Sequence, residues 1–149
     1  MKPLIPNYSI IAFICCLLPV AFCLSCGGPE GFKKPEDALD AGREFVRAVL
    51  DGDYTKAELF VLPEAEDRQL FERFTEHMKK RPENERLGLK SASIQINKVD
   101  ELNDSVTVIN YANSFEKHPA DVRVVKHNGE WWVDFSYTFS GRSLEDSLK

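Results

Sequence analysis

The chain has 149 residues, with 19 Lys or Arg against 24 Asp or Glu, so its formal net charge at pH 7 is −5. This length allows one domain of ordinary size. Because nucleic-acid binding depends on neutralising phosphates, an acidic chain with no basic cluster in its sequence predicts no nucleic-acid partner.

The N-terminal residues have the composition of a targeting segment. Lys2 is followed by an apolar run over residues 10–24, interrupted only by Pro19. Fifteen residues are too few to cross a bilayer, which takes roughly 20, but they suit the core of a secretory signal. All four cysteines lie within residues 15–26, in or beside this run and away from any histidine, so a zinc site or a disulfide framework is not favoured.

The end of the run, Leu24-Ser25-Cys26, resembles a bacterial lipoprotein signal. The resemblance implies that residues 1–25 are removed, that Cys26 is diacylated, and that residues 26–34 form a tether to the membrane. Gly27 stands where an aspartate would retain such a protein in the inner membrane, so we expect an outer-membrane anchor facing the periplasm. Ordinary cleaved secretion and a retained N-terminal anchor are the open alternatives.

Three helices are expected after the tether. Pro35 opens the first, which carries an apolar stripe at intervals of three and four: Ala38, Ala41, Phe45 and Val49. A turn at residues 51–53 leads into a second helix over residues 54–62, with Asp53 as its N-cap. The third helix starts at residue 63, carries Leu70, Phe71, Phe74 and Met78 on one side, and must end near Arg81-Pro82.

From Ala92 the apolar period changes to two, which predicts strands. Asn128-Gly129 between alternating runs is a strong hairpin signal, because a type I′ turn needs positive φ at both positions. A two-residue loop fixes the register. The expected inner pairs are Lys126/Trp131, Val124/Val133, Val122/Phe135 and Ala120/Tyr137, and the expected outer pairs are Val125/Trp132, Arg123/Asp134 and Asp121/Ser136.

These elements predict an α+β domain over residues 35–140, with three N-terminal helices packed on one face of a four-stranded antiparallel sheet. Residues 141–149 are expected to form a C-terminal tail.

The order of these features resembles the small envelope domains of the NTF2-like superfamily, in particular the DUF4878 (lumazine-binding-like) group. The matching pieces are Pro35, the stripe through Phe45, the Gly52-Asp53 turn and the Lys126-x-x-Gly129-x-Trp131 pattern. The resemblance covers residues 35–137 and implies a cone-shaped fold with a pocket between sheet and helices. NTF2-like folds host enzymes, ligand binders and assembly modules, so the resemblance assigns no catalytic residue.

Few residues are candidates for chemistry. Asp134 is expected to pair with Arg123 across the hairpin, which leaves it little catalytic role. Tyr137, expected on the inner face, and Asn110, which shares the parity of Val106 and Val108, are the candidate pocket-lining residues. His77 is expected to be structural, while His118 and His127 lie in loops. No metal-ligand spacing, cofactor motif or nucleophile arrangement occurs, so we predict no metal, cofactor or catalytic residue.

The sequence therefore predicts a lipid-anchored cell-envelope protein whose domain binds a small molecule or protein without catalysis. One alternative is an assembly module that self-associates or docks to another envelope protein through Val125 and Trp132 on the outer sheet face. Another is an isomerase or dehydratase, which would need a proton-transfer residue in the pocket.

Overall fold

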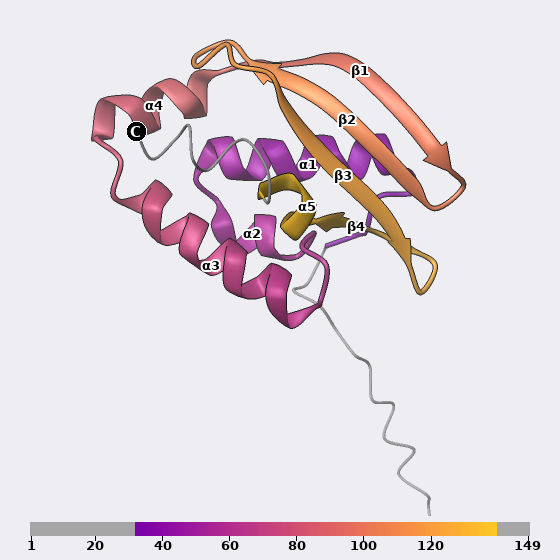
Figure 1. The fold of residues 1–149 in the computed structure, drawn as a ribbon. Helices are drawn as coiled ribbons and strands as arrows, with labels where there is room; N and C mark the ends of the chain where they lie inside the picture. The colour runs from indigo at the N-terminus through magenta and orange to yellow at the C-terminus, as the bar shows by residue number, and fades with distance from the viewer. Residues whose placement is uncertain (1–31, 140–149) are drawn as a thin grey trace, which may run out of the picture. The chain divides into compact units, whose positions relative to one another are not determined.

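The structure, a computed structural model, describes residues 32–139 (Figure 1). The chain divides into two units, residues 1–32 and 33–149, and the fold below is that of the second. The predicted signal peptide, the lipidation site Cys26, most of the tether and the predicted tail over residues 141–149 lie outside the described residues. Within residues 32–139, no helix has both the length and the apolar character needed to cross a bilayer.

Four helices precede four strands, and a short helix follows the last strand. The predicted α+β class with a four-stranded antiparallel sheet is confirmed, in the order β1-β2-β3-β4. The elements in chain order are α1 (Ala38–Asp51), α2 (Tyr54–Glu58), α3 (Ala65–Lys79), α4 (Glu83–Ser91), β1 (Ile94–Asn103), β2 (Val106–Asn113), β3 (Ala120–His127), β4 (Glu130–Asp134) and α5 (Phe135–Phe139).

Helix α1 packs on the sheet through the predicted stripe. It begins where the Asp37 carboxylate accepts a hydrogen bond from the Asp40 amide at 2.8 Å, and it ends at Gly52, whose φ of 75° is in the left-handed region. Ala41 and Phe45 are buried between the helix and the strands. In Figure 1 this helix crosses behind the strands, α3 lies on its far side, and α4 lies beside the end of the sheet where β1 begins.

The second helix is shorter than predicted, and four helices precede the sheet where three were predicted. The second helix ends at Glu58 because the chain then extends and runs parallel to β4: the Leu62 amide donates to Val133 O at 2.9 Å, and the Val133 amide donates to Phe60 O at 2.8 Å. The predicted third helix does end before Pro82, but a further helix, α4, starts directly after it with Pro82 as its N-cap. Helix α4 was not predicted because its sequence is short and charged and carries no apolar stripe.

The β3–β4 hairpin has the predicted register up to Asp134, and the pairs predicted for Phe135, Ser136 and Tyr137 do not form because these residues belong to α5. Val124 pairs with Val133, Val125 with Trp132 and Arg123 with Asp134. Asn128 and Gly129 have φ of 52° and 84°, as a type I′ turn requires.

Strand β2 faces the helices with Thr107 and Ile109, and not with the face that carries Val106, Val108 and Asn110. Its pairing places Ile109 opposite Val122, and both are buried under α1. Thr107 is buried on the same face, so Val106, Val108 and Asn110 point outward, opposite to the expectation. Apolar residues occur at both parities of this strand, and only its pairing with β3 decides which set faces the core.

The chain changes from strand to helix after Asp134. The buried carboxylate of Asp67 in α3 accepts hydrogen bonds from the Phe135 amide at 2.5 Å and the Ser136 amide at 2.9 Å. Asp134 accepts from the Tyr137 amide at 2.9 Å and so caps α5 as well. The ring of Phe135 stays in the core, edge-on to Phe71 at 5.3 Å between centroids.

Candidate functional site

An inner pocket of about 170 Å³ lies between the sheet and the helices. Apolar side chains of α1, α3 and α4, among them Phe45, Val46 and Met78, form one side of it. The polar groups come from α3, from the turn before α4, from the end of β2 and from the loop over residues 114–119. They are His77, Arg81, Tyr111, Asn113, Glu116 and His118, and α5 adds Thr138.

An ion pair crosses this pocket between segments far apart in the chain. Arg81 donates to Glu116 Oε1 at 2.7 Å, and the Asn113 amide group donates to Glu116 Oε2 at 3.0 Å. Asn113 Oδ1 in turn accepts from the backbone amides of Phe115 at 3.1 Å and Glu116 at 2.8 Å, which shapes the loop. Both carboxylate oxygens of Glu116 are therefore engaged. The opposite charges of Glu116 and Arg81 largely neutralise each other because the two groups form an ion pair.

Tyr111 provides a polar group with no protein partner. Burial raises the pKa of its phenol to about 12, and the nearby charge of Glu116 acts in the same direction. Its hydroxyl makes no hydrogen bond to any of residues 32–139. A half-buried phenol that lines the pocket and has no partner among the described residues is available to a ligand.

The two residues expected in the pocket lie elsewhere. Asn110 is on the outer face, where it accepts from Asn97 at 2.9 Å and donates to Asp121 at 2.6 Å. Tyr137 is 45% exposed in α5, with the Arg123 guanidinium 4.9 Å above its ring. The strand-to-helix change after Asp134 places Tyr137 outside the inner pocket.

Asp134 occupies the predicted ion pair, with 3.4 Å between its Oδ2 and Arg123 Nη1. Its other oxygen accepts from the Ser136 hydroxyl at 2.9 Å as well as from the helix amide already described. These contacts give the carboxylate a structural role.

The outer sheet face around Val125 and Trp132, which the docking alternative requires to be open and apolar, is partly covered. Both residues are half-buried. The ammonium of Lys34 lies over the indole of Trp132 and pairs with Glu130 at 3.5 Å. The predicted tether therefore ends in a docked residue, and α1 follows directly from a segment bound to β4.

On the other face of β4, the Trp131 Nε1–H donates to the Glu36 carbonyl at 3.2 Å. Lys34 and Glu36 together attach the segment before α1 to both faces of this strand.

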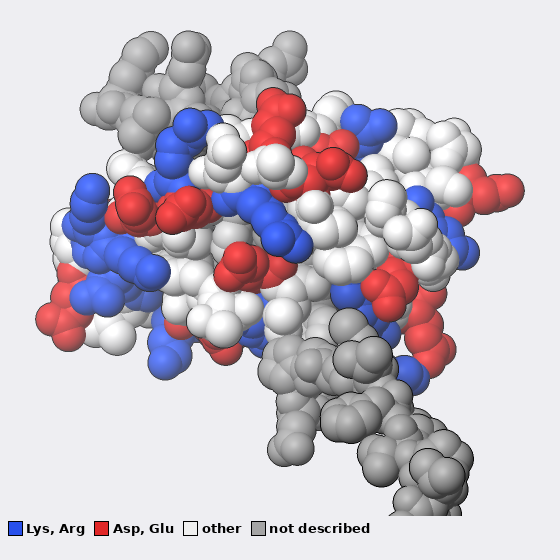
Figure 2. All heavy atoms as spheres, turned by 90° about the horizontal axis from the view of Figure 1, so that it is seen from below, with Lys and Arg blue, Asp and Glu red and all other residues white. Residues whose placement is uncertain are grey.

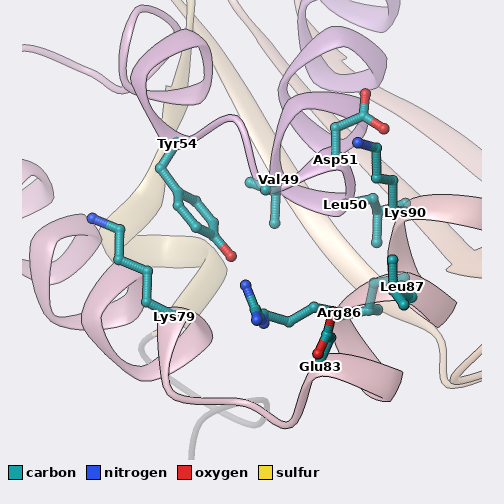
Figure 3. Close-up of a pocket in the computed structure, with 11 residues that line it drawn as sticks. Val49, Leu50, Asp51, Tyr54, Lys79, Glu83, Arg86, Leu87 and Lys90 are labelled. Carbon is teal, nitrogen blue, oxygen red and sulfur yellow. The ribbon is translucent and has the colours of Figure 1, made fainter.

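A second, outer pocket of about 330 Å³ lies among the end of α1, the start of α2, the end of α3 and α4 (Figure 3). Tyr54 and Arg86 project into it from opposite sides, and the phenol oxygen faces the guanidinium. Val49, Leu50 and Leu89 line both pockets, so the two share an apolar wall.

Within residues 32–139, no three side chains of His, Cys, Asp or Glu are arranged to hold a metal ion. Charged side chains of both signs are interspersed on the face seen in Figure 2. Compared with models of protein families, with curated proteins and with solved structures, the chain finds no match.

The sequence reasoning missed the polar groups of the inner pocket. Asn113 and Glu116 carried a usable signal, since an Asn followed by a Glu three residues later is typical of a self-bonded turn. Tyr111 and Arg81 carried no such signal.

Proposed function

We propose that this protein is a lipid-anchored cell-envelope protein whose NTF2-like domain binds a small molecule in the inner pocket without catalysing a reaction. The observation that carries the proposal is the pocket itself: an apolar wall beside one unpartnered phenol, Tyr111, between helices and sheet. Apolar concavities with a few placed polar groups are typical ligand sites.

The size and charge of the pocket narrow the ligand class. A cavity of roughly 150 Å³ accommodates a benzene-sized molecule, and this one measures about 170 Å³. Arg81 and Glu116 offset each other, so no net charge is presented to the ligand. We therefore propose an uncharged ligand of about one ring, with one oxygen that hydrogen-bonds the Tyr111 hydroxyl.

The absence of catalysis is part of the proposal. A proton-transfer mechanism needs a carboxylate or imidazole placed against the substrate. Of the carboxylates, Glu116 already accepts bonds from Arg81 and Asn113, and Asp134 is engaged at the start of α5. The imidazoles of His77 and His118 also line the pocket, and the proposal holds that neither takes part in proton transfer. Docking through Trp132 has less support, because Lys34 covers that ring.

Native mass spectrometry of the protein extracted from its own envelope tests ligand binding, with phenol as the added probe. We expect a small extra mass or saturable phenol binding in the wild type. Tyr111→Phe should weaken it about tenfold, the worth of one hydrogen bond of about 1.4 kcal/mol. Tyr137→Phe, which removes a half-exposed phenol outside the pocket, is the matched control. A wild type with neither bound mass nor phenol binding would contradict the proposal.

Membrane anchoring is tested separately. Cys26→Ala should move the protein from the membrane fraction to the soluble fraction, because the acyl chains provide the attachment. A variant that stays in the membrane fraction, with the processing of the wild type unchanged, would show that the lipid is not the anchor.

A further inference from the structure

We propose that the outer pocket is a second binding site, for a small carboxylate with an apolar body. This inference does not depend on the ligand of the inner pocket. It rests on three features of the outer pocket: unpaired positive charge, a phenol facing a guanidinium, and an apolar floor.

Positive charge lines the pocket without protein counter-ions. Lys79, Arg86 and Lys90 line it from exposed positions, and none of the three forms an ion pair with any of residues 32–139. Asp51, one of the two acids in the lining, is already paired with Arg47 at 2.9 Å. Glu83 is then the one acidic group among the lining residues that is left to oppose three cations.

Arg86 is the cation of the three that can hold an anion inside the pocket. Lys79 and Lys90 lie in the last turns of α3 and α4, where positive charge complements the carbonyl end of a helix. Arg86 lies earlier in α4 and is exposed at the surface, and its side chain extends into the pocket (Figure 3). A guanidinium with free N–H groups is suited to a carboxylate.

Tyr54 supplies a hydroxyl donor beside this guanidinium. Its hydroxyl makes no hydrogen bond within residues 32–139, and the Lys79 ammonium lies 5.7 Å from its ring centroid. Burial raises the pKa of the phenol, while the charges of Arg81 and Arg86 act against that shift. The hydroxyl therefore stays protonated at neutral pH and can donate to an anion held by Arg86.

The rest of the lining fixes the kind of anion. Val49, Leu50, Leu87 and Leu89 form an apolar surface, and Leu87 is 59% exposed. A hydrocarbon chain or ring would cover Leu87, while its carboxylate reaches Arg86 and Tyr54. Bare inorganic phosphate would leave this apolar surface in water. The volume of about 330 Å³ lies within the range of small-molecule sites.

Calorimetric titration of the mature protein with hexanoate, hexanamide and inorganic phosphate tests the proposal. We expect saturable hexanoate binding that is at least tenfold tighter than binding of hexanamide or phosphate. Arg86→Met should weaken hexanoate about 10- to 100-fold, since a hydrogen bond to a charged group is worth about 1.5–3 kcal/mol. Tyr54→Phe should weaken it by a smaller factor.

Arg43→Met is the matched control, because Arg43 is exposed on α1 beside Asp40 and does not line the pocket. Tyr111→Phe should also leave hexanoate binding unchanged, which separates this site from the inner pocket. No hexanoate binding, equal binding of hexanamide, tighter binding of phosphate, or unchanged binding in Arg86→Met would each overturn the proposal.

Discussion

Gly42 of α1 lies directly against Ile109 of β2. A Cβ atom at Gly42 would fall 2.5 Å from Ile109 Cδ1 and 3.3 Å from Val124 Cγ2. The missing side chain is what allows α1 to approach the sheet this closely. Gly88 of α4 stands in a similar relationship to the ring of Phe115, where an added Cβ would overlap the ring.

These two glycines should respond differently to alanine. Gly42→Ala is expected to lower the free energy of unfolding by about 1–3 kcal/mol, because Ile109 is buried and has no room to move. Gly88→Ala should be close to neutral, since Phe115 is 45% exposed and can rotate outward while alanine adds up to about 1 kcal/mol of helix propensity. Urea unfolding of the two variants measures this difference. Equal losses would show that the approach of α1 to the sheet is not limited by Ile109.

Asp67 should be important for stability although it lines neither pocket. Asp67→Ala leaves the amides of Phe135 and Ser136 without their acceptor, with an expected loss of about 2–3 kcal/mol. Asp67→Asn keeps a carbonyl oxygen there and should lose less. Urea unfolding at pH 7 compares the two variants. If both variants were equally destabilised, the hydrogen bonds from the Phe135 and Ser136 amides would not explain the effect of Asp67 on stability.

The same carboxylate predicts a pH dependence. Burial raises the pKa of Asp67, against the lowering effect of its two amide bonds. The folded protein then holds this proton at a higher pH than the unfolded chain does. Its contribution to stability is therefore largest at low pH and falls as pH rises from about 3.8 through the raised pKa. Asp67→Asn should remove this slope from unfolding free energies measured between pH 3.5 and 7.

Tyr111 should be the phenol that titrates near pH 12. In ¹³C NMR of ring-labelled tyrosine, we expect one resonance to shift only near that pH and to be missing in Tyr111→Phe. Because the unfolded phenol ionises near pH 10, this residue should make the protein less stable as pH rises from about 10 to 12. Tyr137→Phe should leave the late resonance in place. If the resonance that titrates near pH 12 were instead missing in Tyr137→Phe, Tyr137 and not Tyr111 would be the tyrosine with the raised pKa.

For Lys34 we expect stability to change with pH in the opposite direction, rising as the pH rises. Burial lowers the pKa of its ammonium from 10.5 to about 8, while Glu130 acts in the other direction. Between about pH 8 and 10.5 the unfolded chain holds this proton and the folded protein does not, so stability should rise with pH. Lys34→Met keeps the apolar stem over Trp132 and should abolish the rise.

Lys33→Met is the control for this change, because Lys33 is highly exposed and pairs with Glu36 at the surface. Unfolding free energies measured across this pH range should keep the wild-type slope in Lys33→Met. Parallel curves for the wild type and Lys34→Met would mean that another group produces the slope.

Features set by neighbouring residues were predictable from sequence. The Asn128-Gly129 turn fixed the hairpin register, and the stripe of α1 identified its buried face. The pairing of Arg123 with Asp134 followed from that register alone. Each depends on a few residues whose backbone preferences or spacing are visible locally.

Features set by distant residues were not predictable. The change from strand to helix at Phe135 depends on Asp67, 68 positions earlier, and it moved Tyr137 out of its expected place. The inner pocket depends on Arg81 meeting Glu116 across 35 positions. Asn110 lies in a strand with apolar residues at both parities, so its orientation depended on pairing that the alternation did not specify.

The extended segment beside Val133 also bears on how this protein avoids aggregation. Because the backbone of residues 60–62 occupies the outer side of β4, the sheet is left with β1 as its open edge among the described residues. That strand has register shifts beyond Ile96 and beyond Glu101 and bears the charges of Lys98 and Asp100, all of which hinder the addition of another strand. A substitution that released residues 60–62 would expose a second, smoother edge, and fibril formation would be expected to start there.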